Sequence, residues 1–219
     1  MLHVFIFHGF KSTANEIAAF DLTPGFASET PPPCRFINSD WDAGAPYLAT
    51  GNGIQAVYQL VASSAALHAE WDVAIGNMAA VSQQTAAMIN QLPGEDALLL
   101  VGYSMGTLLI GDMVAQLTRK RDIYLFFMAG SLDRQRAGQL LDNRNVIQAI
   151  NCLSPRDFML RKQLPEFMPP PISPVGLHAI DHDKALNAHT GLAHADYLQD
   201  PAVLSRYGAF ILQILQRHP

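Results

Sequence analysis

The segment "LLLVGYSMGTLLIGDMV", Leu98 to Val114, decides the fold of this chain. An apolar run leads into a serine that lies between two glycines, and an apolar helical pattern follows. A buried strand that passes directly into a helix needs a very tight turn, and the residue at the apex takes a strained backbone conformation. Gly102 and Gly106, two residues to either side of Ser104, are the small neighbours that such a turn requires. The segment therefore predicts a strand, a sharp turn at Ser104, and a helix.

Composition indicates a globular chain with a sizeable core. Of its 219 residues, 49% are hydrophobic and 15% are charged, so we expect one domain over residues 1–219. The formal net charge is -5 and no basic stripe is visible, which argues against a nucleic-acid partner. The cluster Arg119–Arg121 lies where we expect a helix to end, and helix-dipole compensation explains it. Cys34 and Cys152 show no zinc-site or disulfide spacing, so we expect two buried apolar side chains.

Short apolar runs bounded by turn residues recur along the chain and are mostly continuous rather than alternating, as in strands covered on both faces. Helical patterns separate these runs. The region 52–92 is predicted as two helices or one bent helix, and 107–119 as another helix. A last helix has Asp200 as its N-cap. This order predicts an α/β fold, a mostly parallel sheet of about six strands with helices on both faces. The predicted strands are Leu2–Phe7, Cys34–Asn38, Ala97–Gly102, Ile123–Gly130, Val146–Ser154 and Val175–Ile180.

No apolar run reaches the roughly 18 residues that a membrane span needs, so we expect no integral membrane segment. The apolar N-terminus lacks the basic region and the small-residue cleavage site of a signal peptide. We therefore expect a cytoplasmic location. The sequence carries no signal for an oligomeric state.

Ser104 has the setting of a reactive hydroxyl. It would lie at a helix N-terminus, where the dipole and free amides favour developing negative charge. A serine nucleophile needs a base, an orienting carboxylate and an oxyanion hole, and in a strand–turn–helix site they follow the order Ser, acid, His. The alternative is a serine that only caps a helix after a glycine turn.

Two acids follow later strands. Asp133 comes after Ile123–Gly130, at the start of a predicted helix, where helix capping explains it. Asp157 comes one strand later, where such enzymes usually place the acid, and we favour it for that reason.

Three histidines follow the last predicted strand: His182, His189 and His194. His194 precedes the C-terminal helix, so its loop can return to the mouth of the sheet, and we favour it modestly over His182. His178 would lie within the strand, in a structural role.

Two backbone amides are candidates for the oxyanion hole, those of Met105, directly after the serine, and of Phe10, in the loop after the first strand. His8 precedes Phe10 in the same loop. The chain order excludes His8 as the base, so we expect it to support the loop.

Four motifs, "HGF", "GYSMG", "SPRD" and "AHADY", occur in the order found in the α/β-hydrolase superfamily, which this chain resembles over nearly its whole length. The first strand of the large version of that fold has no counterpart here, so a compact form is expected. The resemblance implies a serine hydrolase.

A narrower resemblance is to a little-characterised group of hydrolase domains that includes the eukaryotic transmembrane and coiled-coil domain proteins. The group's Asn-x-x-Ser-x-x-Asp-x-x-Leu pattern matches Asn151, Ser154, Asp157 and Leu160. Its Gly-His-x-x-Tyr pattern matches "AHADY", with Ala193 in place of the glycine. This resemblance implies Asp157 and His194 as the partners of the serine. The membrane segments of the eukaryotic members have no counterpart here.

The expected reaction is hydrolysis of an ester-type bond (carboxylester, lipid ester or thioester) in a small-molecule substrate, through an acyl-enzyme on Ser104. Specificity should come from rim loops, and the apolar segment 158–174 would be a small lid or would only pack onto the body. Trp41 would line the pocket or anchor its loop. The expected substrate contacts are Tyr103, Trp41, Phe158 and Met159.

Two rival interpretations remain open. One is a non-catalytic binding or scaffold domain that retains the serine turn. The other is a metal hydrolase that uses 178–183 with His189, His194 or Asp196, although no recognised ligand spacing is present. The favoured chemistry needs no cofactor and no metal.

Overall fold

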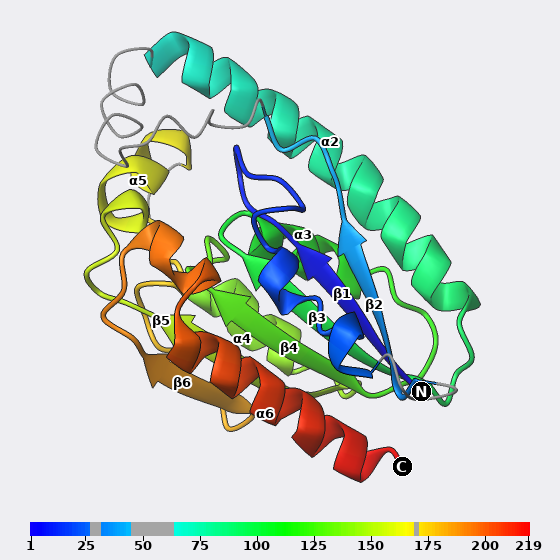
Figure 1. Cartoon of the computed structure of the whole chain (residues 1–219). Coiled ribbons are helices and arrows are strands. Elements are labelled where there is room, and N and C mark those ends of the chain that lie inside the picture. The colour runs from blue at the N-terminus through cyan, green and yellow to red at the C-terminus, as the bar shows by residue number, and fades with distance from the viewer. Residues whose placement is uncertain (27–31, 45–63, 169–170) are drawn as a thin grey trace.

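A computed structural model describes residues 1–26, 32–44, 64–168 and 171–219. The strands of this part form one six-stranded sheet in the order β2-β1-β3-β4-β5-β6, and every neighbouring pair is parallel (Figure 1). The carboxyl ends of all six strands therefore meet at one edge. The strands are β1 (Leu2–Phe7), β2 (Cys34–Ser39), β3 (Ala97–Tyr103), β4 (Ile123–Met128), β5 (Val146–Leu153) and β6 (Ala185–His189).

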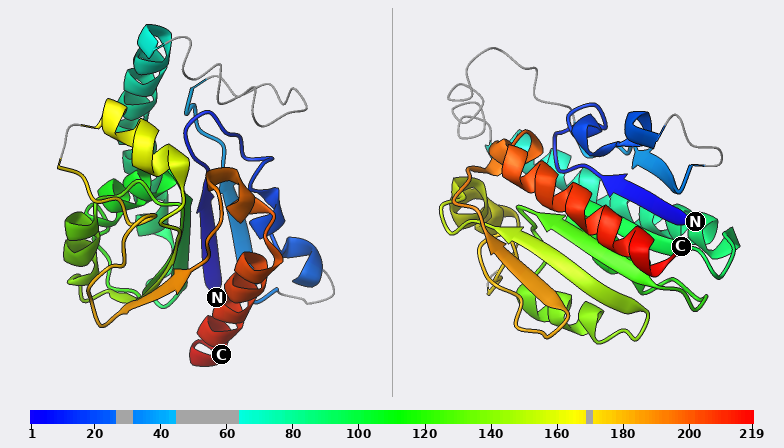
Figure 2. Two further views of the ribbon diagram at one scale, coloured as in Figure 1. Left: turned by 90° about the vertical axis from the view of Figure 1, so that its left-hand side faces the viewer. Right: turned by 60° about the horizontal axis from the view of Figure 1, so that its bottom comes forward.

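Helices cover both faces of the sheet (Figure 2). One face carries α2 (Ser64–Gln91), α3 (Gly106–Val114) and α4 (Arg134–Leu141), and the other carries α6 (Pro201–Arg217) and the short turn η1 (Ala18–Phe20). None of the helices in the described segments combines the length and apolarity needed to cross a lipid bilayer. The remaining short elements are η2 (Thr23–Phe26), η3 (Met159–Gln163, a π-helical turn), α5 (Leu164–Phe167) and η4 (His194–Leu198).

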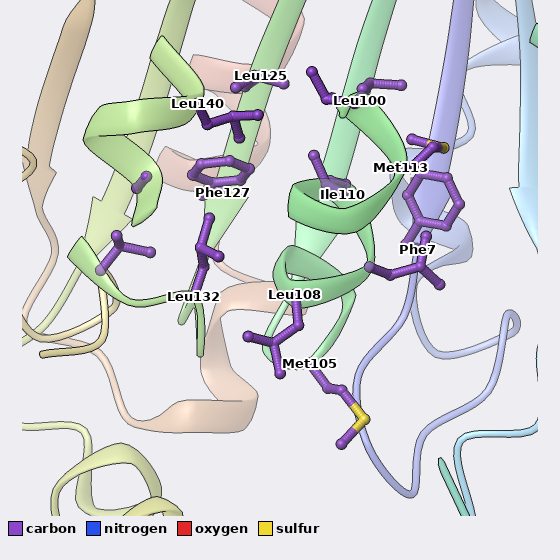
Figure 3. Packing of buried hydrophobic residues seen from close by; sticks show 14 of the residues in the cluster. Phe7, Leu100, Met105, Leu108, Ile110, Met113, Leu125, Phe127, Leu132 and Leu140 are labelled. Carbon is purple, nitrogen blue, oxygen red and sulfur yellow. The ribbon is translucent and has the colours of Figure 1, made fainter. Parts of the chain in front are cut away.

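Alternation along each strand divides the core into two clusters, one on each face. In β1, Phe5 and Phe7 face α2 and α3, whereas Val4 and Ile6 face α6. Figure 3 shows the first cluster, in which side chains of β1, β3 and β4 pack around Ile110 of α3. Covered on both faces, these strands need no polar positions, which explains their continuous apolar runs.

The sixth strand is not where the apolar pattern predicted it. Val175–Ile180 forms turns and bends, and it crosses the carboxyl ends of β4 and β5 with hydrogen bonds from Gly176 N to Gly130 O and from Ser154 N to Gly176 O. The segment is apolar because it is packed against those strand ends. The real last strand, β6, lies at the sheet edge, is half exposed and carries polar residues, so it lacks an apolar run.

Two helix predictions also change. Helix α2 is unbroken from Ser64 to Gln91, so the described part of the region predicted as two helices or one bent helix is a single helix. Positions 52–63 of that region lie outside the described residues. Helix α3 ends at Val114, five residues before the predicted end. Arg119 and Arg121 donate hydrogen bonds to the carbonyl of Leu92, so they stabilise the C-terminal end of α2 instead.

The start of α6 matches the prediction. Asp200 has extended backbone angles, its carboxylate accepts hydrogen bonds from the amides of Ala202 (3.0 Å) and Val203 (2.9 Å), and Pro201 occupies the first turn. This cap fixes the start of α6, the main helix on its face of the sheet.

Replacing Asp200 by alanine should lower the free energy of unfolding by about 1 kcal/mol, because two amides lose their acceptor. Urea unfolding followed by circular dichroism measures the change. Asp72→Ala, which removes the same charge from an exposed position inside α2, is the control and should change stability by less than about 0.5 kcal/mol. Equal effects of the two variants would contradict the capping role.

Candidate functional site

Ser104 occupies the tight turn between β3 and α3, as the sequence predicted. Its φ is +52°, a left-handed conformation that only three non-glycine residues adopt in the described part of the chain. A Cβ on Gly106 would lie 2.3 Å from the carbonyl oxygen of Phe7, and one on Gly102 would lie 2.8 Å from Ile110 Cδ1. Gly106 is therefore needed because backbone atoms approach too closely for any side chain, whereas a side chain at residue 102 would require Ile110 to move.

A continuous hydrogen-bond chain begins at the serine. Ser104 Oγ lies 2.9 Å from His194 Nε2, and His194 Nδ1 lies 2.7 Å from Asp157 Oδ2. Asp157 is fully buried, whereas the side chain of His194 is 15% exposed and Ser104 is 8% exposed. An imidazole that donates its Nδ1 proton to the carboxylate leaves Nε2 free to accept the hydroxyl proton.

The loop after β5 holds the carboxylate. Asp157 Oδ1 accepts a hydrogen bond from the amide of Leu160 (3.1 Å), and the Asp157 amide donates to Ser154 O (3.1 Å). Asn151 Nδ2 donates to the carbonyls of Val175 (3.0 Å) and His178 (3.3 Å), and so ties the crossing segment to β5. These contacts hold the loop of Asp157 against β5 and the crossing segment.

Two tyrosines support the loop that carries His194. The Tyr103 hydroxyl donates to the carbonyl of His194 (3.2 Å), and the two rings lie 5.3 Å apart. Tyr197, fully buried in η4, accepts a hydrogen bond from Thr190 Oγ1 (3.2 Å). Burial, with further effects from nearby carboxylates, raises the pKa of Tyr103 well above its usual value, so its hydroxyl remains a neutral donor.

The other candidate acid has a different task. Asp133 is the N-cap of α4, where Oδ1 accepts from the amides of Gln135 and Arg136 and Oδ2 accepts from Ser173 N (2.9 Å). Burial alone would raise the pKa of Asp133, but these hydrogen bonds outweigh it and lower the pKa. The cap and the Ser173 amide account for the hydrogen bonds that this carboxylate accepts from the described segments.

The other histidines after β5 lie away from the serine. His182 lies before the amino end of β6, at the opposite edge of the sheet, beside Asp183 (2.8 Å). His178 is exposed in a bend rather than in the predicted strand, and His189 is exposed in β6. In the described segments, no three side chains of His, Cys, Asp or Glu gather closely enough to hold a metal ion.

The loop after β1 lies against Ser104. A Cβ on Gly9 would be only 2.8 Å from the Cβ of Ser104, so this glycine allows the loop to approach Ser104 closely. Met105 is the fully buried N-cap residue of α3. The amides proposed for the oxyanion hole thus belong to two segments that flank the serine.

His8 and Trp41 brace this loop. His8 is buried, its Nε2 accepts from the Trp41 amide (3.3 Å), and the rings stack at 5.6 Å. Trp41 Nε1 donates to the His8 carbonyl (3.3 Å). Burial lowers the pKa of His8, which favours the neutral ring that these contacts need. Trp41 is absent from the cavity wall described below, so its contacts are those of a loop anchor.

Lys11 is a feature of the site that sequence reasoning missed. It has a φ of +55°, it is 8% exposed, and its amide donates to Ala43 O (2.8 Å). Its ammonium group forms an ion pair with Glu70 of α2. The pair joins the loop after β1 to a helix about 60 residues away, and no local pattern in the sequence announces it.

A cavity of about 420 Å³ opens beside Ser104 and His194. Tyr103, Phe158 and Met159, which the sequence predicted as substrate contacts, all line it. Trp71 of α2 also lines it and was missed, because nothing in the sequence brings that helix to the site. The wall is completed mainly by Phe10, Lys11, Glu16, Leu160, Leu164, Phe167 and Asp196.

Comparison with known proteins identifies the fold. No protein-family model matches the chain, and a search of curated protein sequences also gave no match. The solved structure of acyl-protein thioesterase 2 from Zea mays is similar, with a TM-score of 0.54 and 11% identity, covering 97% of this chain and 93% of that one. The chain has the α/β-hydrolase fold. A methylesterase from Arabidopsis matches over 99% of both chains with 11% identity and a TM-score of 0.47.

The likeness to the thioesterase structure confirms the fold class predicted from the sequence, and the sheet has six strands. In α/β-hydrolase folds with parallel strands, ligands approach the carboxyl ends of the strands. Ser104, Asp157 and His194 lie after β3, β5 and β6 at that edge. The cavity opens there as well.

Gly106→Ala should destabilise the protein by about 1–3 kcal/mol, because the added methyl group meets the Phe7 carbonyl and the backbone must shift. Thermal unfolding of matched variants measures the effect. Gly76→Ala, at an exposed position of α2 with nothing within 4 Å of the added Cβ, should instead stabilise by up to about 1 kcal/mol. A neutral Gly106→Ala variant would contradict the close approach described for this turn.

Proposed function

We propose that this protein is a serine hydrolase that cleaves an ester-type bond through an acyl-enzyme on Ser104. The observation that carries the proposal is the unbroken hydrogen-bond chain from Ser104 through His194 to Asp157, at 2.9 and 2.7 Å. Its open end faces a cavity at the carboxyl edge of the sheet. A buried carboxylate, an oriented imidazole and a strained serine together form the arrangement that activates a hydroxyl for attack.

Acylation begins when Ser104 Oγ attacks the carbonyl carbon of the ester and His194 Nε2 takes the hydroxyl proton. The buried carboxylate of Asp157 holds the imidazole in position and stabilises its positive charge. Negative charge that develops on the carbonyl oxygen is stabilised by the amides of Phe10 and Met105. The partial positive charge at the start of α3 adds to this stabilisation.

The carbon–oxygen or carbon–sulfur bond to the leaving group then breaks, and the imidazolium of His194 donates its proton to that group. A water molecule attacks the acyl-serine while His194 accepts one of its protons. The carboxylic acid is released, the proton returns to Ser104 Oγ, and the enzyme is regenerated. No cofactor enters either half of the cycle.

Ser104→Ala and Asp157→Asn should each lower kcat for p-nitrophenyl acetate by about 10⁴-fold or more, because the nucleophile or the correct imidazole tautomer is lost. A fluorophosphonate probe should label the wild type at Ser104 and should not label Ser104→Ala. Steady-state kinetics and mass spectrometry provide the measurements. If the wild type is neither labelled nor active on any ester, the chain is better described as a binding domain.

Asp133→Asn serves as the matched control for the acid. It keeps one side-chain oxygen that can cap α4 and removes the second acceptor, which binds the Ser173 amide. This variant should retain kcat within about twofold, while stability falls by about 1 kcal/mol. Loss of activity in Asp133→Asn with normal activity in Asp157→Asn would reverse the assignment of the acid.

The Lys11–Glu70 ion pair should position the oxyanion loop rather than touch substrate. Lys11→Met is expected to lower kcat by about 10-fold to 100-fold with a small change in KM, since the Phe10 amide loses its alignment. Glu70→Gln should have a similar effect, and the double variant should be no worse than either single variant.

The Lys11→Gly variant distinguishes the effect of the strained backbone at residue 11 from the effect of the lost charge. It should lose activity as Lys11→Met does, yet be more stable than Lys11→Met by about 1 kcal/mol, because glycine adopts the positive φ without strain. Thermal unfolding beside the kinetics measures both effects. A change confined to KM in all four variants would indicate substrate contact instead of positioning.

A further inference from the structure

The cavity beside Ser104 has two chemically different halves, which belong to opposite faces of the sheet. One half is apolar and is formed by residues of the α2–α3 core, namely Phe10, Trp71, Leu164 and Phe167. The other half contains Glu16, Tyr103, His194 and Asp196. Tyr103 belongs to the core on the α6 side, and η4, which carries His194 and Asp196, contacts α6. Ser104 lies between the two halves because it ends the central strand β3.

Three aromatic rings form the wall of the apolar half. Trp71 stacks on Phe167 with ring centroids 4.9 Å apart, and Phe10 meets the edge of Trp71 at 5.1 Å. Phe10 and Phe167 lie 6.3 Å apart, so each ring contacts the other two. Leu164, 5% exposed, adds an aliphatic wall from α5. The rings come from the β1 loop, α2 and α5, so the structure assembles this surface from three distant segments.

Carboxylates mark the other half. Glu16 and Asp196 both lie near enough to act electrostatically on the Tyr103 hydroxyl. Both carboxylates are exposed to water in the free protein. Arg156 is also exposed, and Lys11 is paired with Glu70. An alkyl chain in this half would remove water from the two carboxylates, which is costly.

The direction in which the leaving group departs assigns one half of the cavity to the leaving group and the other to the acyl chain. The leaving group must receive its proton from His194 Nε2, so it departs on the α6 side, where His194 lies. The acyl chain on the same carbonyl carbon then extends away from His194, toward the three aromatic rings. This assignment rests on the proposed function, since only hydrolysis through Ser104 and His194 fixes the direction of departure.

The size of the apolar half limits the length of the acyl chain that it can hold. With roughly 30 Å³ taken for one methylene, about the share of a water molecule in the liquid, a cavity of 420 Å³ has room for roughly 14 such groups. We assign half of this room, roughly seven groups, to the apolar half. We propose that the substrate is an ester of a medium-chain fatty acid, with an acyl chain of roughly six to eight carbons packed against Phe10, Trp71 and Phe167.

A series of p-nitrophenyl esters from acetate to dodecanoate tests the proposal, because the leaving group stays constant. From acetate to octanoate, kcat/KM should rise by up to about fourfold per methylene, and it should level off or fall for longer chains. A flat profile, or a maximum at acetate, would overturn the acyl assignment while leaving the hydrolase proposal intact. Absence of both turnover and fluorophosphonate labelling would overturn both.

A variant in the apolar half tests whether the acyl chain of the substrate packs there. Phe167→Ala should reduce the ratio of octanoate to acetate kcat/KM at least tenfold, because the chain loses a ring that it packs against. Val73→Ala, at an exposed position of α2 two residues from Trp71, is the matched control and should keep the wild-type ratio. A wild-type ratio in Phe167→Ala would contradict packing of the chain against this ring.

Glu16→Val tests the orientation, since it makes the α6 half more apolar. It should leave the acyl-length profile unchanged and should increase the preference for longer alcohols in a series of octanoate esters. A steeper acyl-length profile in Glu16→Val would place the acyl chain in the α6 half and overturn the proposed orientation.

Discussion

The left-handed backbone of Ser104 is the constraint on which the rest of the site depends. A non-glycine residue with φ near +52° is strained by about 1–2 kcal/mol, and it persists only where its surroundings hold it. Here the Ser104 amide donates to Met128 O (2.9 Å), and its carbonyl accepts from Thr107 Oγ1 (2.7 Å). The hydroxyl is thereby fixed at the carboxyl edge of β3, where the histidine and the first loop can reach it.

Strain of this kind is concentrated at one edge of the sheet. In the described part of the chain, positive φ occurs outside glycine at Lys11, Ser104 and Ala129, which follow β1, β3 and β4. These three strands are neighbours in the sheet. The turns after these strands are held by contacts with one another and with α2. The packed core therefore stabilises backbone conformations that would be unfavourable alone.

The sequence predicted the parts that depend on local chemistry. Continuous apolar runs identified β1, β3, β4 and β5 because both faces of these strands are covered, and the glycine spacing identified the turn at Ser104 for steric reasons. The edge strand β2, in which only Cys34 is buried, was identified from a shorter run between turn residues. The prediction failed at β6, since an edge strand with polar residues carries a weak pattern, whereas Val175–Ile180 is apolar for a different reason. Trp71 and the Lys11–Glu70 pair could not be predicted, because α2 reaches the site only through the folded topology.

The segment from η3 to α5 connects β5 to the rest of the chain without adding a strand to the sheet. Its last part, α5, carries Leu164 and Phe167 to the cavity, whereas Asp157 is held by Ser154 and by the Leu160 amide of η3. Exchange of α5 during evolution would therefore alter which molecules are admitted while sparing the reactive apparatus. Selectivity and reactivity can in this way diverge independently among descendants of one ancestral chain.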